Sequence, residues 1–308
     1  MRRYGVILGE ALIDLLETTI DDEIVYRPAI GGGPLNVAVG TVRLGCDAEL
    51  VGSLGDDVFG QRIRVFLREA GVGDRGLVTV PVPTTLAVTA FDGNKPDFHF
   101  YGQPPSYGLF GPDDLDEALV AGAAALYCGS IALLCEPALA AARRAWTLPG
   151  PVRFFDPNVR QHLLDDGSRV RSIVEEFAAT ADVVKLSADD AQALYRTEPL
   201  ETARHLADLG AGTVVLTLGP DGALVVRGGR VAEVPGVSAR AVDTTGAGDA
   251  CMAALVAGSL RDGMPDDLAG WTDLVGWAMR VAAVVCELPG GAVAMPTADA
   301  VTRRFADR

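Results

Sequence analysis

A glycine-rich run followed by an acid, Asp243-Thr-Thr-Gly-Ala-Gly-Asp249, is the stretch of this chain best suited to chemistry. Gly246 and Gly248 carry no Cβ, so the backbone there can turn sharply and approach a ligand closely. An apolar helical pattern begins directly after them, and the unpaired amides at a helix start attract anions. Asp249 would lie at the edge of such an anion site. That position suits a base that deprotonates a nucleophile about to attack phosphorus.

The run alone is also compatible with an ordinary helix start, because Asp and Thr cap free helix amides well. It is not a Walker loop, since the pattern G-x-x-x-x-G-K-[ST] occurs nowhere in the chain. It also lacks the third glycine of a dinucleotide-binding fingerprint. Other residues must therefore decide whether this is a site of phosphate chemistry.

Polar residues near the N-terminus suit a polyhydroxylated ligand. The segment Gly9-Glu10-Ala-Leu-Ile-Asp14 places an acid just outside an apolar stretch, and Gly31-Gly-Gly-Pro-Leu-Asn36 places an amide one turn beyond three glycines. Asp accepts from hydroxyls, Asn both donates and accepts, and glycines let a sugar ring approach the main chain. Taken singly, Asp14 is better interpreted as a solvated strand residue, and the glycines as a flexible turn.

Short apolar runs alternate with helical patterns along the chain, which predicts an α/β fold with a mostly parallel sheet covered on both faces. The predicted strands are 4–8, 49–53, 124–128, 152–156, 183–186 and 214–218. The predicted helices are 35–44, 59–70, 114–121, 137–146, 169–179 and 200–209, then, after a hairpin at 222–234, 247–260 and 268–286.

Two segments, about 11–30 and 84–104, interrupt this alternation with antiparallel strand patterns that have one solvent-exposed face. They are too small to form a domain, so we expect a little sheet that projects from the body as a lid over a substrate cleft. The chain shows no linker or repeat, which predicts a single domain over 1–308. Exposed lid strands can pair between subunits, so a homodimer is one arrangement that the lid allows.

Composition narrows the class of protein. A length of 308 residues with 49% hydrophobic and 22% charged residues is typical of a compact globular protein. The net charge of −15 argues against nucleic acid and anionic membrane surfaces as partners. The uncharged stretch 118–135 is long enough to cross a bilayer, but its glycines and the Glu136-Pro137 stop predict buried core instead. Scattered cysteines and an N-terminus unlike a signal peptide predict a cytoplasmic location.

Further motifs complete a pattern that belongs to a known family. Together with Asp156-Pro-Asn-Val-Arg160, Lys185-Leu-Ser-Ala-Asp-Asp190 and Thr217-Leu-Gly-Pro-Asp-Gly222, the runs above resemble the ribokinase-like (PfkB) carbohydrate kinases, most closely the bacterial fructokinases. The resemblance extends from about residue 9 to 296. It implies a three-layer α/β/α fold with a small projecting β-sheet lid. It also implies ATP-dependent phosphorylation of a sugar hydroxyl, with fructose as the expected sugar.

The resemblance also implies roles for individual residues. Asp249 matches the catalytic base, and an anion hole is implied at Gly246, Ala247 and Gly248. The sugar-binding residues expected from the same comparison are Asp14, Gly32, Gly33, Asn36 and Arg160. The aromatic run 98–101 of the lid adds Phe100, whose ring suits the apolar side of a sugar, although ordinary core aromatics of a strand explain the run equally well. The expected nucleotide contacts are Lys185, Thr217, Gly219, Gly222 and Gly248.

Two further positions are expected near metal ions, and two positions depart from the family pattern. Asp190 stands where the family usually has Glu in an N-x-x-E motif, so an indirect contact of this shorter side chain with Mg²⁺ is expected but left open. Asp243, with carbonyls near 289–291, corresponds to a monovalent-cation site suited to K⁺. Gly33 stands where kinases of phosphorylated sugars tend to carry Lys, which favours an unphosphorylated sugar.

Alternatives to a fructokinase remain at this point. Within the family, 2-keto-3-deoxygluconate, another hexose or a nucleoside would also be a suitable substrate, and Arg160 would pair with a substrate carboxylate. A non-catalytic sensor of sugar or nucleotide is a second class, although a sensor has no need of the base at Asp249. A nicotinamide dehydrogenase is disfavoured, because no G-x-G-x-x-G follows the first strand.

Overall fold

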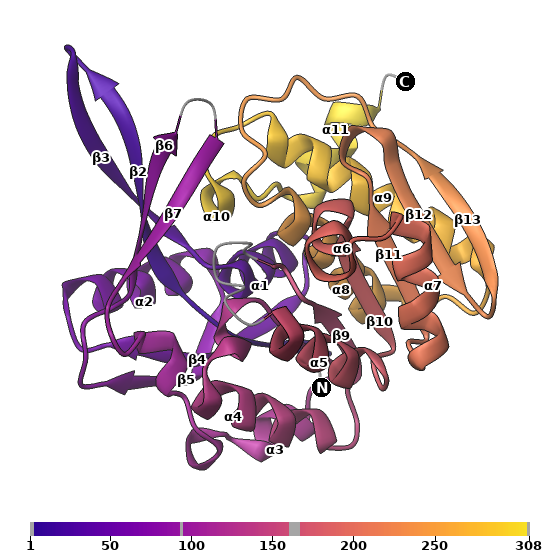
Figure 1. Cartoon of the computed structure of the whole chain (residues 1–308), viewed down its shortest axis with the longest axis horizontal. Helices are drawn as coiled ribbons and strands as arrows, with labels where there is room; N and C mark the ends of the chain where they lie inside the picture. Colours follow the sequence, from indigo (N-terminus) through magenta and orange to yellow (C-terminus); the bar gives the residue numbers. More distant parts are fainter. Residues whose placement is uncertain (1–2, 93–94, 160–166, 307–308) are drawn as a thin grey trace.

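A nine-stranded sheet forms the centre of the part of the chain that the computed structural model describes, residues 3–92, 95–159 and 167–306 (Figure 1). Its strand order is β13-β12-β11-β10-β9-β8-β1-β4-β5, parallel from β11 to β5 and antiparallel at β12 and β13. The strands are β1 (Tyr4–Leu8), β4 (Asp47–Gly55), β5 (Gly73–Val80), β8 (Ala125–Gly129), β9 (Val152–Asp156), β10 (Val183–Ser187), β11 (Thr213–Thr217), β12 (Gly222–Arg227) and β13 (Arg230–Pro235).

Helices cover both faces of this sheet, because successive strand residues point to opposite sides. In β1, Ile7 belongs to one buried core and Val6 and Leu8 to the other. On the side of Ile7 lie α1 (Gly33–Arg43), α2 (Val58–Ala70), α8 (Ala247–Asp262), α9 (Leu268–Cys286), α10 (Gly291–Ala294) and α11 (Ala298–Phe305). On the other side lie α3 (Glu117–Ala121), α4 (Glu136–Thr147), α5 (Gly167–Ala178), α6 (Ala188–Tyr195) and α7 (Pro199–Leu209). The three-layer α/β/α architecture is confirmed.

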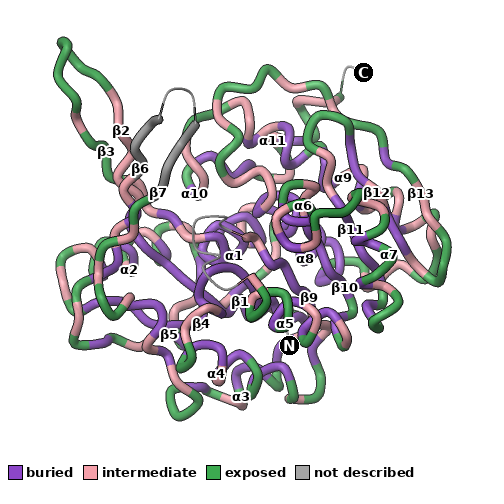
Figure 2. Tube along the Cα trace, viewed as in Figure 1, coloured by how far each residue is buried: buried purple, intermediate pink, exposed green. Residues whose placement is uncertain are grey.

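A second sheet projects from the body, at the upper left of Figure 1. Its order is β3-β2-β6-β7, with β2 (Leu12–Ile20), β3 (Glu23–Gly31), β6 (Leu86–Asp92) and β7 (Lys95–Tyr101). Figure 2 shows that the far end of β2 and β3 is exposed. The two antiparallel pairs match the expected lid segments, and a parallel pairing of β2 with β6 joins them. The expected turn at 92–94 falls partly outside the described residues.

The structure also contains elements that the patterns did not predict. The edge strand β5 begins with Gly73-Asp-Arg-Gly76. Gly and Asp are rare in strands, so the sequence pattern did not indicate a strand here. The short helix α6 is marked by a capping box rather than by an apolar stripe, and α10 and α11 are also short. The helix expected over 114–121 begins only at Glu117, because the side chain of Asp116 caps it by accepting from the amide of Leu119.

Helix α9 is long and apolar enough to cross a membrane by length and composition alone. In this fold it packs instead against α8 and against the hairpin strands β12 and β13. Trp271 and Val275 on α9 are completely buried in that contact. The uncharged stretch 118–135, as expected, divides into the end of α3, the buried strand β8 and a short 3₁₀ turn.

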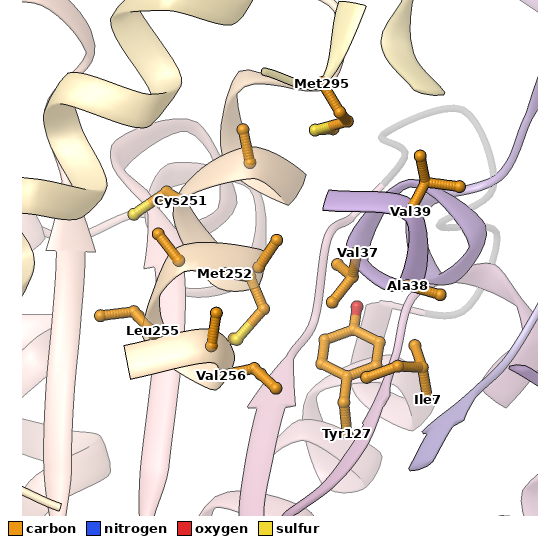
Figure 3. Close-up of a cluster of buried hydrophobic side chains, with 14 of the residues drawn as sticks. Ile7, Val37, Ala38, Val39, Tyr127, Cys251, Met252, Leu255, Val256 and Met295 are labelled. Atoms are coloured by element: carbon orange, nitrogen blue, oxygen red, sulfur yellow. The ribbon is translucent and has the colours of Figure 1, made fainter. Parts of the chain in front are cut away.

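The contact between α1 and α8 brings two distant parts of the sequence together. Figure 3 shows Val37 of α1 and Met252 and Val256 of α8 pointing into one apolar cluster. Helix α8 is buried from Asp249 to Leu260, as expected for a helix that is apolar on all sides. The missing side chain of Gly40 allows the close approach, because a Cβ there would lie only 2.6 Å from the Cβ of Ala253.

We predict that Gly40→Ala destabilises the protein, since overpacking a core contact typically costs about 1–3 kcal/mol. The matched control is Gly276→Ala in the middle of α9, where the nearest atom to the new methyl group would be 4.0 Å away. There the better helix propensity of Ala should stabilise by up to about 1 kcal/mol. Urea unfolding of both variants measures the difference. Equal stability changes at the two positions would contradict this description of the α1–α8 contact.

Candidate active site

A cavity of about 80 Å³ lies where the loops after β1 and β8 meet the first turns of α1 and α8. This is the carboxyl-terminal edge of the parallel strands, where open α/β sheets bind their ligands. The walls include the side chains of Glu10, Asn36, Ser130 and Asp249. Gly246 caps α8 with a φ of +82°, a conformation that favours glycine, and thereby turns the chain into the helix beside the cavity.

Asp249 is held from two sides by side-chain amides. Asn36 Nδ2, from α1, donates to Asp249 Oδ2 at 2.8 Å. Asn158 Nδ2, from the loop after β9, donates to Asp249 Oδ1 at 3.2 Å. The carboxylate is only 6% exposed, so the two hydrogen bonds fix its direction inside the cavity. A carboxylate held in this way is oriented as a proton acceptor requires.

Bare backbone at the start of α1 forms another wall. Gly32 has a φ of +115°, and a Cβ there would lie 2.6 Å from the carbonyl oxygen of Glu10. A Cβ on Gly33 would lie 2.6 Å from Asn158 Nδ2 and 3.3 Å from Asp249 Oδ1. Both positions therefore need glycine for the chain to pass this close to the site. Main chain rather than side chain therefore faces the cavity here.

Glu10 organises the loops beneath the cavity, a role that the sequence analysis did not assign to it. Its carboxylate is 1% exposed and accepts hydrogen bonds from the amides of Gly33 (3.2 Å) and Ala132 (3.3 Å). It therefore joins the start of α1 to the loop after β8. Its position, two residues beyond the buried strand β1, was the available signal.

The lid supplies the remaining wall. Asp14 of β2 lines the cavity and packs against Gly31 of β3, where a Cβ would collide with the Asp14 carboxylate. Leu12, Ala87 and Phe100 add an apolar surface from β2, β6 and β7. The cavity thus has polar groups on the side of the sheet and an apolar surface on the side of the lid. The other expected sugar contact, Arg160, lies outside the described residues.

A second, larger cavity of about 330 Å³ lies on the other side of the same turn. Thr217, at the end of β11, and Gly219, just beyond it, line this cavity together with apolar side chains of α9 such as Met279. The turn before α8 contributes Thr244, Ala247 and Gly248 to the larger cavity, but Thr245, Gly246 and Asp249 to the smaller one. The run Thr244–Asp249 is therefore the common wall of two cavities.

Lys185 and Gly222, both expected at the nucleotide, do not line this cavity. Gly222 begins β12 with a φ of +109°, and a Cβ there would collide with the carbonyl oxygen of Val234 on β13. Lys185 is buried, and its Nζ donates to Asp156 Oδ2 at 2.8 Å. A Cβ on Gly248 would lie 2.9 Å from that Nζ, so the cation lies beneath the turn.

The Lys185–Asp156 pair is a buried ion pair. Burial raises the pKa of Asp156 to about 6, although the neighbouring Lys185 cation acts in the opposite direction. Burial alone would lower the pKa of Lys185, but the Asp156 carboxylate raises it above its ordinary value, so the ammonium stays charged. A fixed positive charge therefore lies next to the first amides of α8, where an anion would bind.

The acids expected at metal ions make contacts within the protein. Asp190 Oδ2 accepts from the amide (2.8 Å) and hydroxyl (2.7 Å) of Ser187, and Oδ1 accepts from the amide of Val159 (2.8 Å). It thus ties the loop after β9 to the start of α6. Among the described residues no group of three or more His, Cys, Asp or Glu side chains could hold a metal ion. The indirect contact of Asp190 with Mg²⁺ stays a prediction.

Asp243 lies next to the segment 289–291, as the family pattern implies. Its carboxylate accepts from the amides of Thr245 and Gly290, each at 2.9 Å. Burial would raise the pKa of Asp243, but the hydrogen bonds from Gly290 and Thr245 hold it below its ordinary value. The carboxylate therefore stays charged beside this loop. The binding of K⁺ there stays a prediction.

We predict that Lys185→Met destabilises the protein by about 3–5 kcal/mol near neutral pH, because it leaves a buried carboxylate unpaired. Without the cation the pKa of Asp156 rises further above that of the unfolded chain. The folded variant then binds a proton that the unfolded chain releases, so its stability is greatest in acid and falls as the pH rises.

Urea unfolding at about pH 5 and about pH 8 gives the free energy of unfolding of both proteins. The difference between Lys185→Met and the wild type should be larger at the higher pH. The control combines Lys185→Met with Asp156→Asn. Its difference from the wild type in free energy of unfolding should no longer change with pH. A loss of the same size at both pH values in the single variant would contradict the ion-pair assignment.

Comparison with known proteins agrees with this geometry. The profile of the pfkB family carbohydrate kinases matches residues 3–298. A fructokinase from Klebsiella pneumoniae is 33% identical over 304 residues, which cover 96% of this chain and 97% of that protein. The ATP-bound fructokinase of Xylella fastidiosa has the same fold, with a TM-score of 0.88, 27% identity, and coverage of 100% of this chain and 99% of that one.

A second solved structure, from Salmonella enterica, is an aminoimidazole riboside kinase complexed with aminoimidazole riboside and an ATP analogue. It has a TM-score of 0.85 and 26% identity, and covers 98% of this chain and 99% of its own. The ribokinase-like fold predicted from the sequence is confirmed, and so is the similarity to fructokinases. This chain belongs to the pfkB family of carbohydrate kinases and is a sugar kinase.

Proposed function

We propose that this chain transfers the terminal phosphoryl group of ATP to a hydroxyl of fructose, with Asp249 as the base. The observation that carries the proposal is the turn at 243–249, which separates a large cavity from a small one and exposes the Asp249 carboxylate to the small one. A donor and an acceptor on opposite sides of one turn are arranged for in-line transfer.

The larger cavity suits the nucleotide. Its apolar lining, from Val237 and the α9 residues Met279 and Ala283, offers a surface for a flat base. The phosphates would then reach the amides of Ala247 and Gly248, which open α8. With a net charge of −15, the protein as a whole repels ATP, so this local anion site has to hold the phosphates.

The smaller cavity suits a sugar. Polar groups from Asn36, Asp14 and Asp249 face an apolar surface that includes Phe100. Asn36 Oδ1 is buried and has no hydrogen-bond partner among the described residues. A buried acceptor of this kind calls for a ligand that carries donors. A hydroxyl placed beside Asp249 would lose its proton to the carboxylate as it attacks the phosphorus atom.

Fructose is favoured for two reasons. The similar proteins from Klebsiella and Xylella are fructokinases. Gly33 also places no cation in the small cavity to receive a sugar phosphate. We further propose that Mg²⁺ enters bound to the ATP phosphates, as this ion usually does, and that K⁺ binds near Asp243. A riboside is the second candidate, because the Salmonella protein of the same fold binds one.

We predict that Asp249→Asn lowers kcat by about 10²- to 10⁴-fold, the usual contribution of a general base. Binding of sugar and ATP should persist, since an amide preserves the shape of the side chain. Calorimetric titration and a coupled ADP-release assay measure the two quantities. The matched control is Asp208→Asn on the exposed surface of α7, which should leave turnover unchanged. A wild-type kcat in Asp249→Asn would refute the assigned role.

The identity of the sugar is tested by ADP release over a panel of fructose, other hexoses, 2-keto-3-deoxygluconate and ribosides. We predict the highest kcat/KM for fructose, because the similar proteins from Klebsiella and Xylella are fructokinases. Absence of turnover with fructose, together with turnover of another panel member, would refute the choice of sugar but not the kinase. Binding of ATP without ADP release for any member would instead favour a sensor.

A further inference from the structure

Ser130 has a backbone conformation that side chains rarely adopt. It follows β8 with φ +65° and ψ −163°. This region is essentially restricted to glycine, and another residue there costs about 1–3 kcal/mol. The amide of Ser130 donates to the carbonyl of Asp156 at 3.1 Å, and its carbonyl accepts from the amide of Leu133 at 3.3 Å. The main chain is therefore fixed on both sides, and a glycine would satisfy the same geometry without strain.

The hydroxyl of Ser130 does not explain the strain through any contact within the protein. Ser130 is 5% exposed, and its Oγ has no hydrogen-bond partner among the described residues. Leaving a buried hydroxyl unpaired adds a further cost of about 1–3 kcal/mol. A strained residue that also carries an unsatisfied buried group is typical of a binding site without its ligand.

The position of the hydroxyl indicates what the ligand is. Ser130 lines the small cavity together with Asp249. The Cβ that Gly33 lacks would lie 3.3 Å from Ser130 Oγ, 3.3 Å from Asp249 Oδ1 and 2.6 Å from Asn158 Nδ2. The space in front of the bare Cα of Gly33 is therefore bordered by a free hydroxyl, the base and the amide that orients the base.

We propose that Ser130 is a sugar-binding residue whose strained backbone directs its hydroxyl to the sugar in front of Gly33. There it hydrogen-bonds a second hydroxyl of the sugar, next to the one that Asp249 deprotonates. The proposal rests on the proposed function only in placing the sugar in the small cavity. It adds a specificity contact, since a substrate without that second hydroxyl would leave Ser130 Oγ buried and unpaired.

Two variants separate the hydroxyl from the strain. Ser130→Ala removes the hydroxyl and keeps the strained backbone, whereas Ser130→Gly removes both. We expect KM for the sugar to rise by roughly three- to tenfold in both variants, the effect of one neutral hydrogen bond. KM for ATP should not change. The melting temperature should rise in both variants, which lose the unpaired buried hydroxyl, and should rise further in Ser130→Gly, which also loses the backbone strain.

The matched control is Arg196→Gly at the end of α6, where another non-glycine residue has a positive φ, +56°. It should raise the melting temperature without changing either KM. A series of singly deoxygenated sugars adds a second measurement. For the analogue that lacks the contacted hydroxyl, wild type and Ser130→Ala should have the same kcat/KM.

A wild-type KM for the sugar in both Ser130 variants would overturn the proposal. So would an equal rise of KM for the sugar and for ATP, which indicates a structural role. Failure of the proposed function is recognised separately, because it appears as absent turnover of fructose by the wild-type enzyme. In that case the variants are compared on the panel sugar that the wild type does phosphorylate, and the expected ratios are the same.

Discussion

The hydrogen bond between Asn36 and Asp249 is the contact on which the arrangement of the site depends. The two residues are far apart in the sequence, and their side chains meet at 2.8 Å only because α1 packs closely against α8. Gly40 permits that approach, and the apolar side chains of α8 hold it in place. The glycine turns that open the two helices then lie on either side of one carboxylate. The packing of the core therefore determines where the side chains of the candidate active site lie.

The turn at 243–249 leads into α8 and lies between the two cavities. Gly246 lets the chain enter α8 while one side of the turn faces the apolar cavity and the other faces the polar one. Lys185, neutralised by Asp156, places a fixed cation beneath the turn without exposing it to solvent. Around Asp249, the proposed base, Asn158 and Ser130 both have a positive φ, so local backbone strain is concentrated where the sugar would bind. The protein has a net charge of −15, so local groups such as Lys185 and the first amides of α8 would have to hold the phosphates of the nucleotide.

Patterns of apolar residues in the sequence predicted much of the fold. Each buried parallel strand is a short apolar run, and α9 has the range expected for it, 268–286. The patterns failed at β5, where Gly73 and Gly76 interrupt the run, and at the short helix α6. The motif residues Asn36, Gly33 and Asp249 do meet in one cavity. Glu10, Ser130 and Asn158 were not recognised, since their roles depend on β1, β8 and β9 being neighbours. Strand order is a property of the whole fold that no local spacing encodes.

The central claim is that one turn separates the phosphoryl donor from the acceptor. A crystal structure of the protein with fructose and a non-hydrolysable ATP analogue tests it most directly. We predict the nucleotide in the cavity lined by Thr217 and Met279, with its terminal phosphate at the amides of 246–248. A fructose hydroxyl should lie within hydrogen-bond distance of Asp249 on the opposite side. Sugar and nucleotide in the same cavity, or a sugar with no hydroxyl near Asp249, would contradict the claim.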